Sequence, residues 1–290
     1  MRLLLIHGRA QEGKSSEIIE DEWMNALRRG FSGAGVSAPA GLRIDAPFYG
    51  DELMKQLARH DLPPADDVAT RGGAGDGDYA AFLEDVAVQL SGDDKVTDRE
   101  IENEMAPGPQ ERGPQNWEWV QAVIRAVDRR VPGVSNYSIG KVLRDVFVYV
   151  NDSRTRREIN RIVAAKLTGE PTVVVGHSLG SVVAYEVLRE HAGNSVLRLI
   201  TVGSPLGIRA IRNQLRTPLT MPAGVKDWYN AYDDRDVVAL YPLTAENFGI
   251  KPPVRNYPFV NNHTDNRHGI GGYLDDADVA GQIAAALAGR

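Results

Sequence analysis

The stretch that decides the fold is Thr172-Val173-Val174-Val175-Gly176-His177-Ser178-Leu179-Gly180, in which a β-branched run leads into the pattern G-x-S-x-G. The next segment, Ser181 to His191, has helical composition. A strand, a sharp turn and a helix in this order can hold a serine hydroxyl exposed on a strained backbone. Gly176 and Gly180 carry no side chains that would collide with the adjoining strand and helix. The sequence therefore predicts a turn that presents Ser178 as a nucleophile.

Around this motif, apolar runs of strand length alternate with segments of helical period. We predict strands at Arg2 to Ile6, Leu42 to Pro47, Thr172 to Val175, Leu197 to Val202 and Val225 to Ala231, and helices at Ser16 to Gly30, Ser181 to His191 and Asp278 to Ala288. In the first helix, Ile18, Ile19, Trp23 and Leu27 are predicted to share one face. Such alternation is typical of βαβ units, so we expect an α/β protein with a mostly parallel sheet.

The interval between about His60 and Pro171 has a different character. Its first part is rich in Gly, Asp and Pro, as in residues 71–77, which is typical of loops. A later apolar set has the spacing i, i+3, i+4, i+7 and i+11 of an amphipathic helix: Val120, Val123, Ile124, Val127 and Val131. We interpret residues 63–135 as a largely helical insertion into a single domain of residues 1–290. It is either a packing layer on the sheet or a cap or lid over a pocket.

Composition excludes several classes of function. The 290 residues include 33 Lys and Arg against 39 Asp and Glu, and this charge of −6 argues against a nucleic-acid binder. The absence of cysteine excludes disulfides, thiolate metal sites and a cysteine nucleophile. No apolar stretch approaches the roughly 20 residues that span a bilayer, and the first apolar run is too short for a signal peptide. We therefore expect a cytoplasmic protein with no transmembrane segment, no metal and no cofactor.

A serine nucleophile needs an imidazole to remove its proton and a carboxylate to orient that imidazole. In proteins with this motif the histidine follows the nucleophile and the acid in the chain, which leaves His263 and His268 among the six histidines. Both lie in a loop-like stretch before the last helix. We favour His268, because it is nearer that helix and a glycine follows it. His263 remains the alternative.

The acid is expected in the loop after the strand that ends at Ala231, where three aspartates compete. Asp236 directly precedes the apolar pair Val237-Val238, so it can be anchored while its neighbours face water. We favour Asp236 and keep Asp233 as the alternative.

Two backbone amides are expected to stabilise a developing oxyanion. The Leu179 amide lies at the N-terminus of the helix that follows Ser178, where the helix dipole is positive. The second donor normally comes from a loop after an early strand, which indicates the Arg9 amide. Gly8 allows the backbone to approach closely there.

The same loop contains a competing motif. Residues 8–15 match G-x-x-x-x-G-K-[ST] between a strand and a helix, so that Lys14 and Ser15 are candidates to contact a nucleotide phosphate and its magnesium. The acidic residue expected at the end of a later apolar strand is missing. A nucleotide-binding protein that uses Gly8 to Ser15 is therefore kept only as an alternative.

With these segments in place, the chain resembles an α/β-hydrolase of the lipase or esterase type. The resemblance rests on Ile6-His7-Gly8, Gly176 to Gly180, Gly203-Ser204-Pro205-Leu206, Asn230 to Val238 and His268. It covers both ends and the second half of the chain, but not the region from Pro63 to Ser135. It implies the α/β-hydrolase fold, with a shortened, mostly parallel sheet and helices on both faces. It also supports Asp236, because the acid of lipase-like members commonly precedes a short apolar pair.

The resemblance implies hydrolysis of an ester or amide by a serine. We expect Ser178, His268 and Asp236 to cleave an ester through an acyl-enzyme intermediate. A lipid or other acyl ester is the expected substrate, given the insertion and the aromatic segment Pro47-Phe48-Tyr49. The alternative from the binding class is a catalytically silent, hydrolase-like scaffold that acts as a binding or effector domain.

Overall fold

The described strands form one six-stranded sheet in which every neighbouring pair is parallel. The computed structural model describes residues 1–60, 62, 77–107, 111–130, 138–193 and 195–289. The strand order is β2-β1-β3-β4-β5-β6. The strands are β1 Arg2–Ile6, β2 Arg43–Asp45, β3 Thr172–His177, β4 Val196–Val202, β5 Trp228–Ala231 and β6 Arg255–Tyr257. The α/β class and the parallel sheet are thus confirmed.

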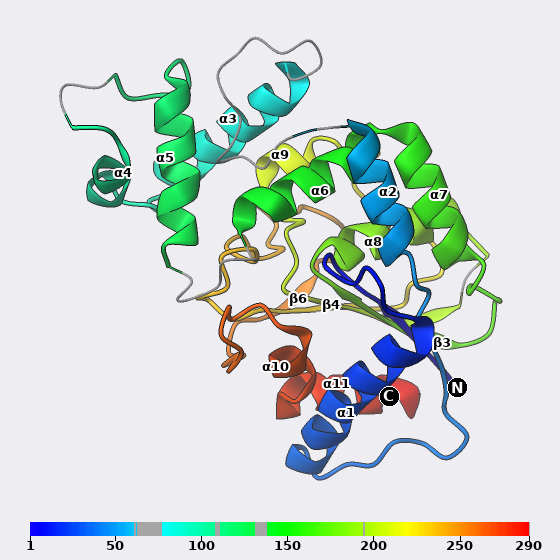
Figure 1. Ribbon diagram of the computed structural model, residues 1–290. Coiled ribbons are helices and arrows are strands. Elements are labelled where there is room, and N and C mark those ends of the chain that lie inside the picture. The colour runs from blue at the N-terminus through cyan, green and yellow to red at the C-terminus, as the bar shows by residue number, and fades with distance from the viewer. Residues whose placement is uncertain (61, 63–76, 108–110, 131–137, 194, 290) are drawn as a thin grey trace.

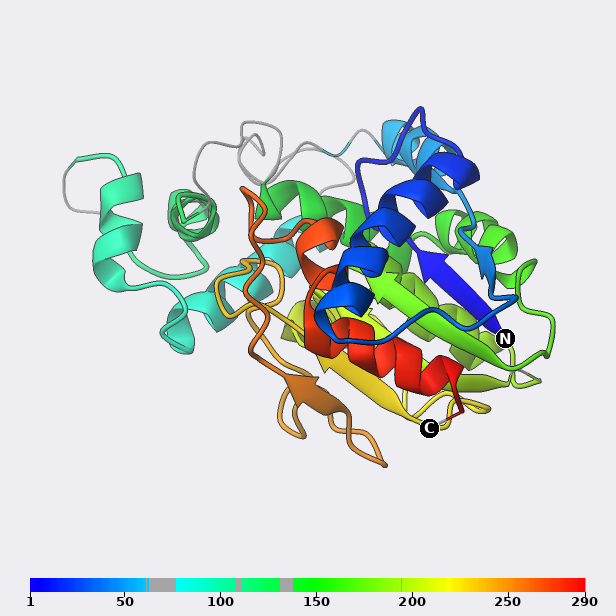
Figure 2. The ribbon, with the colours of Figure 1, turned by 90° about the horizontal axis from the view of Figure 1, so that it is seen from below.

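Helices cover both faces of the sheet (Figures 1 and 2). One face carries α1 Ser16–Gly33, α10 Ile270–Leu274 and α11 Ala277–Leu287. The opposite face carries α2 Gly50–His60, α6 Ile139–Asn151, α7 Ser153–Ala164 and α8 Leu179–Glu190. Alternate residues of β1 point into the two cores. Leu3 and Leu5 pack with α1 and α11, while Leu4 and Ile6 pack with α8. This explains why the central strands are apolar without alternation.

The predicted elements differ from the structure in detail. The strand predicted to start at Val225 starts at Trp228, and Val225 makes only an isolated bridge to Val196. Ile18 was expected on the buried face of the first helix, but it is 46% exposed. Successive helix residues point about 100° apart, so Ile18 turns to solvent when Ile19 is buried.

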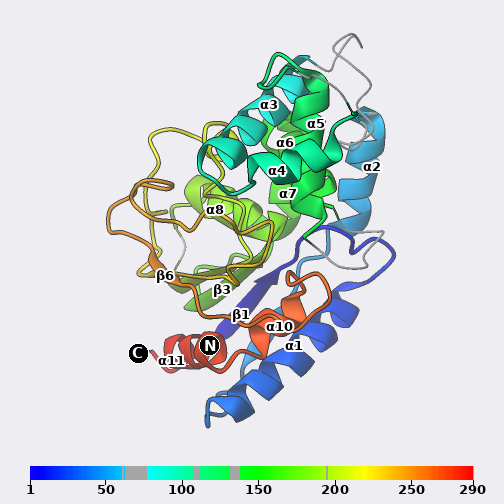
Figure 3. The ribbon, with the colours of Figure 1, turned by 90° about the vertical axis from the view of Figure 1, so that its left-hand side faces the viewer.

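The insertion contributes three described helices, α3 Gly77–Gly92, α4 Asp98–Glu104 and α5 Trp117–Asp128. They lie together at one end of the molecule (Figures 1 and 3). Both α3 and α5 pack on α6, and α3 also packs on the short helix α9 Arg209–Arg212. Their apolar residues belong to the same core cluster as β1 and α8. Residues 63–76, 108–110 and 131–137, and with them Val131, lie outside the described residues.

Among the residues that the structure describes, no helix combines the length and the apolar character that crossing a membrane requires.

The turn after β3 depends on a close backbone crossing. A Cβ atom on Gly180, in the first turn of α8, would lie closer than 3.0 Å to the carbonyl oxygens of Ile6 and His7 at the end of β1. Real Cβ atoms do not approach backbone that closely, so only glycine lets α8 pack directly against β1.

We predict that Gly180→Ala lowers the free energy of unfolding by about 2 kcal/mol, because β1 and α8 must separate to admit the methyl group. Gly281→Ala is the matched control, since Gly281 also lies in a helix but its added Cβ would meet only Ala34 Cβ, at 4.0 Å. The control is expected to raise stability by about 0.5–1 kcal/mol through helix propensity. Urea unfolding of both variants measures the difference, and equal stability would contradict the crossing.

Candidate active site

Ser178 occupies the sharp turn between β3 and α8. Its backbone has φ 55° and ψ −129°, which a residue with a side chain adopts only at a cost. The Ser178 amide donates to the carbonyl of Val202 on the neighbouring strand, at 3.1 Å. A Cβ on Gly176 would lie 2.8 Å from the carbonyl oxygen of Gly180, so the turn requires a small residue there too. The strand, turn and helix predicted around the serine are all present.

The hydroxyl of Ser178 is held in an unusual environment. The residue is 1% exposed, and within the described part of the chain its Oγ has no hydrogen-bond partner. Most buried hydroxyls are hydrogen-bonded, so an unsatisfied one needs an explanation, and a reactive role is one such explanation.

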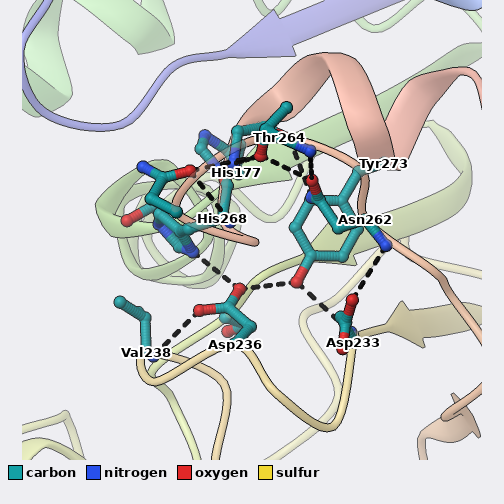
Figure 4. Close-up of polar contacts among 12 residues, drawn as sticks. His177, Asp233, Asp236, Val238, Asn262, Thr264, His268 and Tyr273 are labelled. Atoms are coloured by element: carbon teal, nitrogen blue, oxygen red, sulfur yellow. Dashed lines mark hydrogen bonds and ion pairs between the residues drawn. The ribbon is translucent and has the colours of Figure 1, made fainter. Parts of the chain in front are cut away.

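Asp236 and His268 are brought together in the interior (Figure 4). His268 Nδ1 lies 2.7 Å from Asp236 Oδ2, and the two residues are 3% and 0% exposed. The other oxygen, Oδ1, accepts from the Val238 amide at 2.9 Å. When Nδ1 donates its proton to the carboxylate, Nε2 of the neutral ring is the basic nitrogen. Asp236 therefore fixes both the orientation and the tautomer of His268.

The two alternative residues are not part of this pair. Asp233 accepts from the Arg235 guanidinium at 3.0 Å and from the Asn262 amide at 2.8 Å. Burial alone would raise the pKa of Asp233, but these hydrogen bonds hold it below its ordinary value. His263 has a side chain that is 62% exposed, and its Nε2 lies 3.6 Å from Asp275.

The expectation that the neighbours of Asp236 face water is correct for Asp234 but wrong for Asp233. Asp234 has a side chain that is 78% exposed, whereas Asp233 is fully buried. The reason is that Asp233 anchors the chain at Asn262, ahead of the loop that carries His268.

Tyr273, on α10, was not singled out from the sequence. Its hydroxyl donates to Asp236 Oδ2 at 2.5 Å, the same oxygen that faces His268. The hydroxyl also accepts from the Asp233 amide, at 3.3 Å. Burial, with the nearby Asp236 charge, raises the pKa of Tyr273 well above its ordinary value, so the hydroxyl stays protonated as a donor. A tyrosine just after a glycine pair carries no motif, so the sequence offered no signal for this contact.

His177, inside the serine motif, links the turn at Ser178 to the loop that carries His268. Its Nε2 lies 2.7 Å from the backbone carbonyl oxygen of His268, which can only accept, so Nε2 donates. The two rings are 4.7 Å apart. Burial first, and then proximity to His268, lowers the pKa of His177 well below its ordinary value. The neutral ring therefore adds no second positive charge beside His268.

His7 orients the peptide group at the predicted second oxyanion donor. The Tyr49 amide donates to His7 Nε2 at 3.1 Å, so the proton is on Nδ1, which donates to the Gly8 carbonyl at 2.8 Å. Because a trans peptide is planar, the Arg9 N–H points opposite to that carbonyl. The Tyr49 ring stacks on His7 at 3.9 Å and is buried, so it faces His7 and not a substrate.

The predicted oxyanion donors lie on backbone next to the serine. A Cβ on Gly8 would come within 2.9 Å of Ser178 Cβ, which places the Gly8–Arg9 peptide beside Ser178. Leu179 opens α8, and no side chain caps that helix terminus. The first N–H groups of such a helix are available to an anion.

A pocket of about 240 Å³ opens onto the site. Its wall includes the predicted groups Ser178, His268, Gly8 and Arg9, together with His7, Ala10, Gln11, Lys14, Glu22, Trp23, His177, Asn266, Gly269 and Ile270. Within the described residues, neither the insertion helices nor the segment Pro47-Phe48-Tyr49 contributes to this wall.

The polar groups of the competing phosphate-binding motif already have partners within the chain. Lys14 Nζ lies 2.6 Å and 2.9 Å from the two oxygens of Glu22. The Gly13 amide, which would face a phosphate, donates to Asp51 Oδ1 at 2.8 Å. Ser15 caps α1 by accepting from the Ile18 amide. In the portion of the chain that the structure describes, no three His, Asp or Glu side chains gather as metal ligands.

Comparison of the chain with protein-family models, with curated proteins and with solved structures found no match.

The buried His7 predicts acid sensitivity. Burial lowers the pKa of His7 from 6.5 to about 4, so between those pH values the unfolded chain binds a proton that the folded chain does not. Stability from this residue is complete above pH 6.5 and is lost as the pH falls toward 4. Between pH 7 and pH 5 we expect His7 to account for a loss of about 2 kcal/mol. Urea unfolding at both pH values should show that loss in the wild type and a smaller one in His7→Asn. Equal losses would contradict the buried, neutral His7.

Proposed function

We propose that this chain is a serine hydrolase with the α/β-hydrolase fold, which cleaves an acyl ester through a covalent acyl-enzyme. The observation that supports it most is the buried pair of His268 and Asp236, at 2.7 Å, in contact with the pocket that also contains Ser178. Structural ion pairs also occur in cores, but the imidazole of this pair lines the same pocket as a strained serine with an unsatisfied hydroxyl.

In the first half of the reaction, Ser178 Oγ attacks the ester carbonyl and His268 Nε2 takes the hydroxyl proton. The carboxylate of Asp236 stabilises the imidazolium that forms, and His268 then protonates the leaving alcohol. In the second half, His268 removes a proton from water, which attacks the acyl-enzyme. The bond to Ser178 Oγ then breaks, His268 returns the proton to that oxygen, and the acid is released.

The amides of Leu179 and Arg9 stabilise the tetrahedral oxyanion. The positive end of the α8 dipole supports the first donor, and the hydrogen bond from His7 to the Gly8 carbonyl orients the second. Donors held in place before the reaction need no reorganisation, and each contributes on the order of 10²–10³ in rate.

Three neighbouring side chains hold the groups of the proposed site in one conformation. Tyr273 holds the carboxylate of Asp236, His177 holds the backbone of His268, and Tyr49 holds the ring of His7. All three are themselves buried or partly buried, so their hydrogen bonds persist without competition from water. Such supporting contacts preserve the geometry that a proton transfer requires.

The pocket favours a small substrate. Its volume of about 240 Å³ is below the roughly 300–1,000 Å³ of sites for drug-sized ligands. A short acyl ester therefore fits this pocket better than a long lipid chain.

A fluorophosphonate probe tests the nucleophile. We expect the probe to label the wild type covalently and Ser178→Ala not at all, because no other described serine lies in the pocket wall. Ser15→Ala is the control, since it removes a serine of the competing motif and is expected to label like the wild type. Intact mass spectrometry measures the labelling, and unfolding curves verify that each variant is folded. A folded wild type that resists the probe would rule out the proposed nucleophile and favour a silent scaffold.

Paired variants test the acid and the histidine. Asp236→Asn and His268→Ala are expected to lower kcat/KM for a short acyl ester by about 10³–10⁴ or more, because the base loses its orientation or is removed. Asp233→Asn is expected to lower stability while its folded fraction keeps turnover within a few-fold of the wild type. His263→Ala is expected to change neither quantity. Near wild-type turnover in Asp236→Asn or His268→Ala would show that the assignment is wrong.

A further inference from the structure

A nearly buried cluster of three charges adjoins the pocket. Asp145, on α6, accepts from Arg9 Nε at 2.9 Å through Oδ2. Its other oxygen accepts from Arg144 Nε at 3.1 Å and Nη2 at 3.0 Å. The exposed fractions of the three side chains are 12% for Arg9, 18% for Arg144 and 2% for Asp145. Two guanidinium groups thus share one carboxylate, and the cluster keeps a net charge of +1.

Arg9 connects this cluster to the pocket. Arg9 belongs to the pocket wall and Arg144 does not. Arg9 uses only Nε for Asp145, and across the described residues neither of its Nη groups has a hydrogen-bond acceptor. Neither Nη atom is among the buried nitrogens that lack a partner in the described residues, so both are open to solvent and available to a ligand. The two Nη groups match the two oxygens of a carboxylate.

Four other titratable side chains of the pocket wall leave no net charge. Lys14 and Glu22 form a two-bond pair, and the rings of His7 and His177 stay neutral because burial lowers the pKa of each. His268 is paired with Asp236, so the cationic group that the wall can offer to a ligand is Arg9, near the positive end of α8 at Ser178. We therefore expect a negatively charged part of a substrate to bind at Arg9.

We propose that the substrate is an ester with a carboxylate a few bonds from the scissile carbonyl, such as a monoester of a short dicarboxylic acid, and that the Arg9 guanidinium binds this carboxylate. The inference rests on the proposed serine hydrolase. Arg9 then serves the substrate twice, since its amide faces the reacting oxygen and its side chain determines specificity. Hydrolysis consumes water and yields the alcohol and the dicarboxylic acid.

A matched pair of esters tests the specificity. Monomethyl glutarate and methyl valerate have five-carbon acyl chains, and only the first ends in a carboxylate. We expect the wild type to favour monomethyl glutarate by at least about 10-fold in kcat/KM, measured by titration of the released acid. That ratio is expected to fall to about 1 or below in Arg9→Gln and to recover in part in Arg9→Lys, which keeps the charge but not the fork.

Arg144→Gln is the control. It removes one charge from the same cluster without touching the pocket wall, so the ratio is expected to stay within about 3-fold of the wild type. If the wild type does not discriminate between the esters, or if Arg9→Gln keeps the preference, the carboxylate site is refuted and the hydrolase is not. Unfolding curves confirm that each variant is folded before the ratios are compared.

A binding measurement separates this inference from the catalytic proposal. Glutarate is titrated calorimetrically into Ser178→Ala and into the double variant with Arg9→Gln, so no turnover is required. We expect binding to weaken at least about 10-fold in the double variant, whereas butyrate binds both weakly and equally. Absence of glutarate binding to Ser178→Ala, or binding that does not depend on Arg9, overturns the site even when Ser178 is the nucleophile.

Discussion

The contact on which the site depends is the crossing of α8 over the end of β1, where Gly180 faces the carbonyl oxygens of Ile6 and His7. Because two backbones meet here without side chains between them, the loop after β1 reaches the turn that carries Ser178. The Gly8–Arg9 peptide then adjoins Ser178, and the Arg9 side chain reaches Asp145 on α6. The positions of Ser178, of the proposed oxyanion donors and of the charged cluster all depend on this crossing, which the cores on both faces of the sheet stabilise.

The local sequence pattern was sufficient to predict a strand where that strand is buried and apolar. The strands β1, β3 and β4 lie in the middle of the sheet, so their β-branched and leucine-rich runs carried the signal. The edge strand β6 was missed because Arg255-Asn256-Tyr257 is short and polar, and only pairing with β5 makes it a strand. Boundaries shifted for a similar reason, as at Val225, where the partner strand decides how far the ladder extends.

The residues of the candidate site also fall into two groups, those that the sequence indicated and those that it did not. The turn at Ser178 could be predicted because its motif and its flanking elements are contiguous. The pairing of Asp236 with His268 could be predicted because chain order left two histidines and an apolar pair follows Asp236. Tyr273 and Asp145 could not, since their contacts join residues 37 and 136 positions apart. Asp233 shows the limit of reasoning about exposure. An aspartate in a polar loop looked solvated, but Arg235 and Asn262 provide hydrogen bonds that make its burial favourable.

The backbone at Ser178 lowers stability at the residue that we propose as the nucleophile. The left-handed conformation that turns the hydroxyl toward the pocket costs on the order of 1–3 kcal/mol for a residue with a side chain. A glycine would fill the turn without this strain, so folding alone gives no reason to retain serine. This strain makes the free energy of folding less favourable, and burial of apolar side chains on both faces of the sheet must compensate for it.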